Sequence, residues 1–195
     1  TIFDFFDGWF ARKLKTGSNF GVELDSLSDF VSFGVAPAIL IYMWSTFLLD
    51  SIGWVSTLFF VICSSLRLAR FTADVYIIDK PINVDNYFVG VPSPAAAGLL
   101  LLPLLIYLEY DSPIFKNEYI NFINTIIIAF LMISRIPTIS LKKININNKY
   151  KTWILLFLII ICIFLISNIW LTLSGILISY IISIFYIVFL KKYPS

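Results

Sequence analysis

The chain has 195 residues, of which 59% are hydrophobic and 13% are charged, and its mean hydropathy is +0.92. In a typical soluble domain about a quarter of the residues are charged. This composition therefore excludes an ordinary soluble protein and indicates a single integral membrane domain. The net charge is only +2 and no long basic run occurs, so we expect no nucleic-acid partner. Histidine is absent, which excludes histidine-based acid–base catalysis and histidine-ligated metals.

The apolar stretches predict the course of the chain through the membrane. A helix needs about 20 apolar residues to cross a bilayer. The fold class that we predict is all-α, a polytopic transmembrane bundle with about seven membrane segments. They lie at about 1–14, 21–48, 51–72, 93–109, 119–141, 152–167 and 169–190. Pro94 suits the first turn of the fourth segment, and Pro137 marks a kink or a late break in the fifth.

Basic residues support this map. If every segment spans the membrane, 13 of the 14 Lys and Arg residues fall on one side and only Lys116 falls on the other. Cytoplasmic loops are enriched in Lys and Arg, so this side is predicted to be cytoplasmic. The polar stretch 73–92 lies on the same side. It is read as a solvated connector, with a substrate lid as the alternative.

Four carboxylates stand out near the N-terminus of this apolar chain: Asp4, Asp7, Asp25 and Asp29. The members of each pair are three or four residues apart, so each pair shares a helix face. Four carboxylates at one point repel one another unless cations compensate them, and oxygen ligands favour Mg²⁺, Mn²⁺ or Ca²⁺. A two-metal site that clamps phosphoryl groups is therefore predicted. The alternative is that these acids cap helix ends or pair with nearby Lys and Arg.

Written as a pattern, this region is D-x2-D-G-x2-A-R-x8-G-x3-D-x3-D. It resembles the signature of the CDP-alcohol phosphatidyltransferase family at every fixed position. The resemblance implies two divalent cations, Mg²⁺ or Mn²⁺, with Ca²⁺ less expected. Asp4, Asp7 and Asp25 would hold one cation, and Asp4, Asp25 and Asp29 the other. Asp29 would also be the catalytic base that accepts the proton of the attacking hydroxyl.

Five further residues are predicted to bind the CDP-linked lipid. Gly8 and Ala11 are small enough to let the nucleotide approach, and Arg12 suits a phosphate through bidentate hydrogen bonds. Arg12 could instead anchor the chain at the cytoplasmic surface. Ser18 lies where the family often places a hydroxyl contact to the nucleotide. Gly21 would allow close helix approach, or it could serve only as a turn residue.

Four stretches resemble the bacterial and archaeal phosphatidylserine synthase branch of the family: 24–38, 66–71, 88–97 and 134–138. The resemblance implies transfer of the phosphatidyl group from CDP-diacylglycerol to L-serine by metal-assisted direct displacement. It covers a core at 1–143, and 152–190 are then two additional C-terminal transmembrane helices. The chain opens at Thr1 inside an expected helix, so we expect the full-length protein to have one more helix. The family is often dimeric, which implies a homodimer.

Three arginines near the cytoplasmic helix ends are candidates for binding the acceptor or the lipid phosphate: Arg67, Arg70 and Arg135. Serine carries a carboxylate, so its site needs a cation close to the membrane surface. The alternative is that these arginines anchor the protein to anionic headgroups.

Two competing functions remain open at this stage. Another CDP-alcohol phosphotransferase, with a glycerol-phosphate or inositol acceptor, would share the core motif. An acidic-site cation transporter would need interrupted helices near the bilayer centre, whereas the acids here gather at one face. The expected location is the cell (cytoplasmic) membrane, with multiple spans in the lipid bilayer and the active site at the cytoplasmic face.

Overall fold

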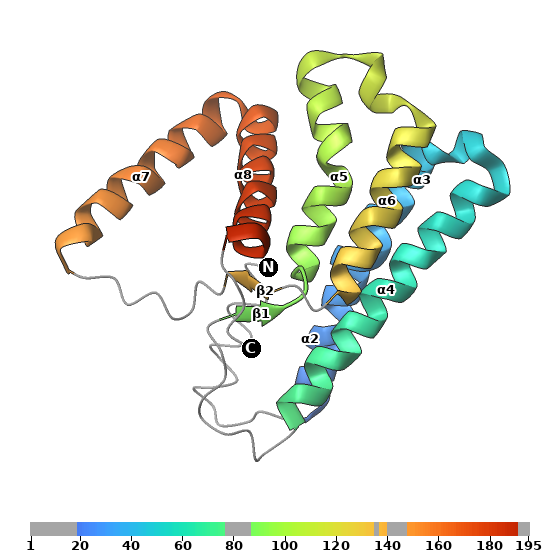
Figure 1. Ribbon diagram of the computed structural model, residues 1–195, viewed down its shortest axis with the longest axis horizontal. Coiled ribbons are helices and arrows are strands. Elements are labelled where there is room, and N and C mark those ends of the chain that lie inside the picture. The colour runs from blue at the N-terminus through green and yellow to red at the C-terminus, as the bar shows by residue number, and fades with distance from the viewer. Residues whose placement is uncertain (1–18, 77–86, 135–136, 140–147, 191–195) are drawn as a thin grey trace.

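A computed structural model describes residues 19–76, 87–134, 137–139 and 148–190 (Figure 1). The elements in chain order are α2 (Asn19–Phe30), the π-helical turn η1 (Val31–Val35), α3 (Ala36–Trp44), the 3-10 turn η2 (Thr46–Leu49), α4 (Asp50–Tyr76), β1 (Tyr87–Val89), α5 (Ser93–Tyr110), the 3-10 turn η3 (Pro113–Lys116), α6 (Glu118–Ile133), β2 (Pro137–Ile139), α7 (Asn148–Ser167) and α8 (Ile169–Leu190). The predicted all-α class is confirmed, and the predicted segment 1–14 lies outside the described residues.

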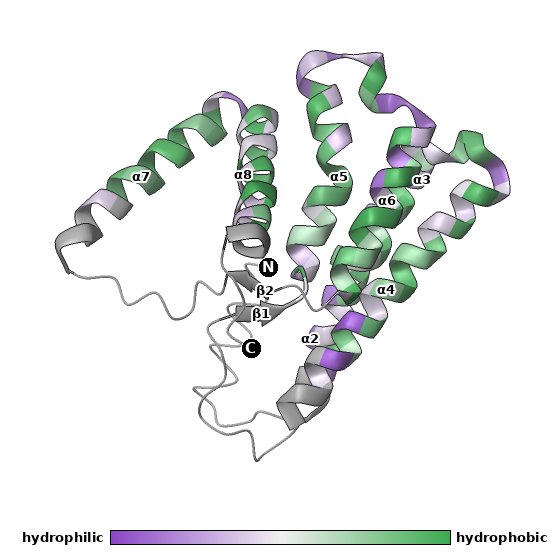
Figure 2. Cartoon of the chain, viewed as in Figure 1, coloured by the Kyte–Doolittle hydropathy of each residue, from purple (hydrophilic) through white to green (hydrophobic). Residues whose placement is uncertain are grey.

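Four helical stretches in the described residues are long enough and apolar enough to cross a membrane: Glu23–Trp44, Thr46–Arg70, Ser93–Tyr110 and Ile169–Tyr186. Two shorter apolar helices, Glu118–Ile133 and Leu155–Ser167, accompany them. Figure 2 shows hydrophobic residues along the helices and hydrophilic residues at the α5–α6 connection and in the lower part of α4. The chain is therefore an integral membrane protein, as the composition indicates.

The core lies where α3, α4, α5 and α6 pack together, and α8 lies along α5 (Figure 1). Ile41, Phe60 and Leu100 are almost wholly buried in this core. Ile184 of α8 belongs to the same cluster, so the last helix is part of the bundle and not an appendage. By contrast, α7 packs against α8, and most of its described side chains are exposed.

The fifth predicted segment, 119–141, is too long. Helix α6 ends at Ile133 because Ser134 has an extended conformation with ψ of 155°. The chain then enters β2, which pairs antiparallel with β1. These two strands were not predicted, because three residues are too short to show an alternating pattern. Gly90 follows β1 with φ of +80°, and an added Cβ would lie 2.8 Å from the Met132 carbonyl oxygen.

Pro103 interrupts the hydrogen-bond ladder inside α5, and α6 supplies a replacement donor. Proline has no N–H, so the carbonyl of Leu99, four residues earlier, loses its helical partner. The Nδ2 of Asn124 donates to the Leu99 carbonyl at 3.3 Å and to the Leu100 carbonyl at 3.4 Å. Backbone groups inside a membrane must be satisfied by the protein itself, so Asn124 compensates the proline from the neighbouring helix.

We expect Asn124→Leu to lower the stability of the bundle by about 1 kcal/mol, because it leaves the Leu99 carbonyl without a donor. Thermal unfolding of the purified protein in detergent would measure the change. The matched control is the same substitution in a Pro103→Ala background, where the backbone N–H gained at position 103 can donate to the Leu99 carbonyl. The loss should largely disappear there. An equal loss in both backgrounds would contradict this role for Asn124.

Candidate active site at one end of the bundle

Helix α2 carries the second pair of predicted carboxylates. Asp25 is exposed and Asp29 is half-buried, and their spacing of four residues places them on one side of the helix. Asp4 and Asp7 lie outside the described residues. Among residues 19–76, 87–134, 137–139 and 148–190, no three His, Cys, Asp or Glu side chains gather into a metal-binding group.

The donor chemistry of α2 fits a hard divalent cation. Asp25 and Asp29 offer carboxylate oxygens one helical turn apart, and Mg²⁺ and Mn²⁺ prefer such oxygen ligands. Mg²⁺ usually binds through one or two protein carboxylates and keeps its remaining positions for water and substrate phosphates. The exposure of Asp25 leaves room for such ligands.

Contacts at the two ends of the bundle show at which end α2 lies. Ser45, at the end of α3, donates from its Oγ to the Lys116 carbonyl at 2.8 Å, so α3 reaches the α5–α6 connection. Helix α2 precedes α3 and contacts α4, so it lies at the opposite end, where α5 begins and α6 finishes (Figure 1).

Arg67 and Arg70 of α4 lie at the same end as α2. The Arg67 Nη1 donates to the Oγ of Ser93 at 2.8 Å, and Ser93 is 5% exposed at the start of α5. The Nε of Arg67 is buried and has no hydrogen-bond partner within the described parts of the chain. The Nη1 of Arg70 donates to the Ile133 carbonyl at 3.3 Å, at the C-terminus of α6. The two guanidinium groups therefore link α4 to two different helices.

Ser93 was not among the residues predicted for the site. Its position before Pro94 indicated a helix start, but nothing in the sequence indicated that an arginine 26 residues earlier would bond to it. Arg135 lies outside the described residues, so its predicted role stays untested.

The predicted contacts to the CDP-linked lipid fall mostly outside the described residues as well: Gly8, Ala11, Arg12 and Ser18. Gly21 is described, and it lies exposed in the first turns of α2. The connector predicted at 73–92 is shorter in the structure, since α4 continues to Tyr76 and β1 begins at Tyr87. Whether it serves as a lid stays a hypothesis.

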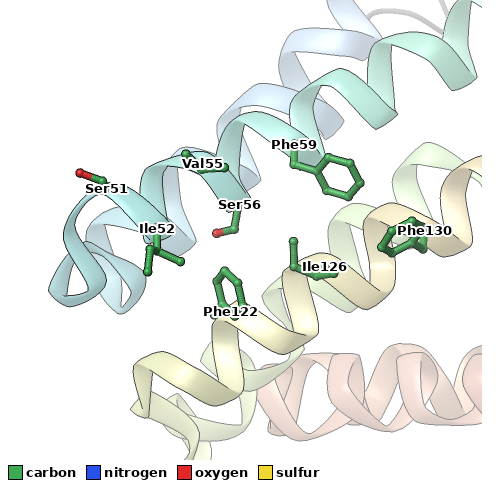
Figure 3. A pocket seen from close by; sticks show the side chains of 8 residues that line it. All are labelled: Ser51, Ile52, Val55, Ser56, Phe59, Phe122, Ile126 and Phe130. Atoms are coloured by element: carbon green, nitrogen blue, oxygen red, sulfur yellow. The ribbon is translucent and has the colours of Figure 1, made fainter.

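A cavity of about 410 Å³ lies between α4 and α6, away from this end (Figure 3). Its lining runs from Ser51 and Ile52 to Phe59 on α4 and from Phe122 to Phe130 on α6. Figure 3 shows the aromatic rings of Phe59 and Phe122 beside the gap. None of the predicted site residues lines the cavity, so it is not the candidate active site.

Comparison with known proteins defines the family. Residues 1–136 match the model of the CDP-alcohol phosphatidyltransferase family, and the chain belongs to this family. Members are generally dependent on divalent cations.

Several curated relatives carry the name CDP-diacylglycerol–serine O-phosphatidyltransferase. The protein of Methanocaldococcus jannaschii is 43% identical over 135 residues, which cover 69% of this chain and 57% of the relative. That of Mycobacterium leprae is 36% identical over 76% of this chain and 49% of the relative. That of Bacillus subtilis is 36% identical over 72% of this chain and 70% of the relative. The chain thus spans about half to two thirds of the length of most of these relatives.

Proposed function

We propose that this protein transfers the phosphatidyl group from CDP-diacylglycerol to the hydroxyl of L-serine, giving phosphatidylserine and CMP. The observation that carries the proposal is the placement of Asp25 and Asp29 at the same end of the bundle as Arg67 and Arg70. An anionic diphosphate and an amino acid carboxylate both need cations, and a hydroxyl nucleophile needs a base. The names of the curated relatives support serine as the acceptor.

The four aspartates would hold two divalent cations, Mg²⁺ or Mn²⁺. Asp4, Asp7 and Asp25 would bind one, and Asp4, Asp25 and Asp29 the other. When bound, the cations neutralise the diphosphate and stabilise the charge that develops on it. Asp29 accepts the proton of the serine hydroxyl. The hydroxyl oxygen forms a bond to the β-phosphorus as the bond from that phosphorus to the departing CMP oxygen breaks.

The arginines of α4 would complete the acceptor side of the site. The Nη1 of Arg67 donates to Ser93, and the N–H of its buried Nε has no acceptor within the described residues. A serine carboxylate or a lipid phosphate would satisfy such a donor through a charge-assisted hydrogen bond. Arg70 and Arg135 are the other two candidates. Gly8, Ala11, Arg12, Ser18 and Gly21 would contact the CDP portion of the lipid.

The proposed location is the cytoplasmic membrane, with the active site at the cytoplasmic face. The strong bias of Lys and Arg toward one side of the predicted map supports it. The proposed division is a core at 1–143 followed by two C-terminal transmembrane helices at 152–190. The packing of α8 on α5 supports one domain. The proposed assembly is a homodimer.

Supplying purified protein with CDP-diacylglycerol, Mn²⁺ and one acceptor at a time would test the function. We expect CMP release with L-serine and little with glycerol 3-phosphate or inositol. Release should also require an acceptor, because the proposed direct displacement forms no phosphatidyl-enzyme intermediate. A preference for another alcohol would refute serine as the substrate, and equally fast release without any acceptor would refute direct transfer.

A further inference from the structure

The helix that carries Asp25 and Asp29 does not continue into the membrane as a regular α-helix. It passes through η1, where the N–H of Ala36 donates to the Val31 carbonyl five residues earlier. The residues on either side of this turn, Phe30 and Ala36, both have right-handed helical angles. The turn therefore accommodates one extra residue inside an otherwise continuous helix.

The extra residue changes the direction in which the carboxylates face. Asp29 precedes Ile41, a core residue that is 2% exposed, by twelve positions. At about 100° per residue, an uninterrupted α-helix would place Asp29 roughly 120° around the axis from Ile41. Accommodating one extra residue reduces this angle to about 20°. The angle between Asp25 and Ile41 around the axis likewise falls from roughly 160° to about 60°.

Two local features hold the turn in place. Pro37 lies at the start of α3, where its ring disfavours a regular α-helical turn before it. Gly34 is buried inside the turn and faces α4. A Cβ at Gly34 would lie 2.7 Å from the Oγ of Ser64, 3.1 Å from the Cβ of Ser64 and 3.2 Å from the ring of Phe30.

The contact between Gly34 and Ser64 also relates the two halves of the candidate site. Ser64 is 1% exposed and lies one helical turn before Arg67 on α4. Asp29 lies five residues before Gly34 on the other helix. Because α3 runs away from the site end and α4 runs toward it, Asp29 and Arg67 both lie on the site side of this contact, about one turn to one and a half turns from it along their own helices.

We infer that the π-helical turn at Val31–Val35 and its Gly34–Ser64 contact position Asp25 and Asp29 toward the bundle, where α4 and α5 lie. Gly34 and Ser64 are positioning residues in this scheme, since neither bears a group that would take part in the reaction. The inference rests on the proposed function, because it concerns the carboxylates that would hold the divalent cations. It explains why a proline and a glycine follow so closely after the acidic pair.

The first test removes the extra residue. Deletion of Val31, whose side chain is 55% exposed, would let the helix run through as a regular α-helix and would turn both carboxylates away from the bundle. We expect the Mn²⁺ dissociation constant to rise roughly 10- to 100-fold, as for other changes that misorient ligands. Binding of Mn²⁺ alone would be measured by titration, together with transfer activity. The matched control is Val31→Ala, which keeps the length and should behave as the parent protein.

The second test keeps the chain length. Gly34→Ala places a methyl group against Ser64, and we expect weaker Mn²⁺ binding by roughly 10-fold with a matching fall in kcat. Ser64→Gly in the same chain removes the two nearest atoms, the Oγ and Cβ of Ser64, leaves the Phe30 ring at 3.2 Å, and should restore binding. A purely structural defect would lower the melting temperature without changing Mn²⁺ affinity, so melting is recorded for each variant. If the Val31 deletion does not fold, this pair decides.

The inference is overturned if the Val31 deletion folds and binds Mn²⁺ as tightly as the parent. It is also overturned if Gly34→Ala leaves Mn²⁺ affinity unchanged, or if Ser64→Gly fails to restore it. These results differ from a failure of the proposed function. If the proposed function fails, the parent protein itself will bind no Mn²⁺ or will transfer the phosphatidyl group to an acceptor other than serine.

Discussion

Replacing Asp25 with Asn is expected to abolish phosphatidyl transfer while leaving the protein folded in the membrane. Asp25 is assigned to both cations, so its loss would leave the diphosphate charge uncompensated. Removal of one preorganised electrostatic contact typically costs 10²- to 10³-fold in kcat, and we expect a fall of at least roughly 1,000-fold here. Asp4→Asn should behave in the same way. CMP release at saturating Mn²⁺ measures the effect.

Glu23 provides a matched control on the same helix. It is an exposed carboxylate two residues before Asp25, and that spacing puts it on a different side of α2. Glu23→Gln removes a negative charge from the same surface and should retain activity. Substantial turnover by Asp25→Asn at saturating metal would contradict the assignment of this residue to both cations.

The arginines of α4 and of the segment after α6 are expected to determine the apparent KM for serine. Loss of a charge-assisted hydrogen bond typically costs ~1.5–3 kcal/mol, or roughly 10- to 150-fold in binding. Replacement of the arginine that holds the serine carboxylate by Gln should raise the KM for serine on that scale. The KM for CDP-diacylglycerol should change much less. Arg12→Gln should show the reverse, since its proposed partner is the diphosphate.

Ser93→Ala distinguishes the two roles that Arg67 could have. If Arg67 serves only to join α4 to α5, loss of either partner of the 2.8 Å hydrogen bond should lower the melting temperature alike and leave KM unchanged. If Arg67 binds serine, Arg67→Gln raises the KM and Ser93→Ala does not. Should none of Arg67, Arg70 and Arg135 affect serine selectively, the acceptor site must use backbone donors, helix termini or a cation.

The sequence alone determined the membrane class and the approximate helix bounds, because a span of about 20 apolar residues is a local property of the chain. Helices α5 and α8 match the predicted segments within a residue at each end. The end of α6 and the strand pair β1–β2 were not predicted. The end of α6 depends on the pairing of the following strand β2 with the distant strand β1, and a three-residue strand has no recognisable period.

The same division applies to the candidate site. The spacing of Asp25 and Asp29 was enough to place them on one helix side, since a four-residue interval fixes their relative direction. Their direction relative to the bundle depends on η1, and Gly34 and Pro37 do not by themselves show that the helix there takes up one extra residue. The bonds from Arg67 to Ser93 and from Asn124 to Leu99 join residues about 25 positions apart. Only the packing of α4, α5 and α6 brings such partners within hydrogen-bonding distance.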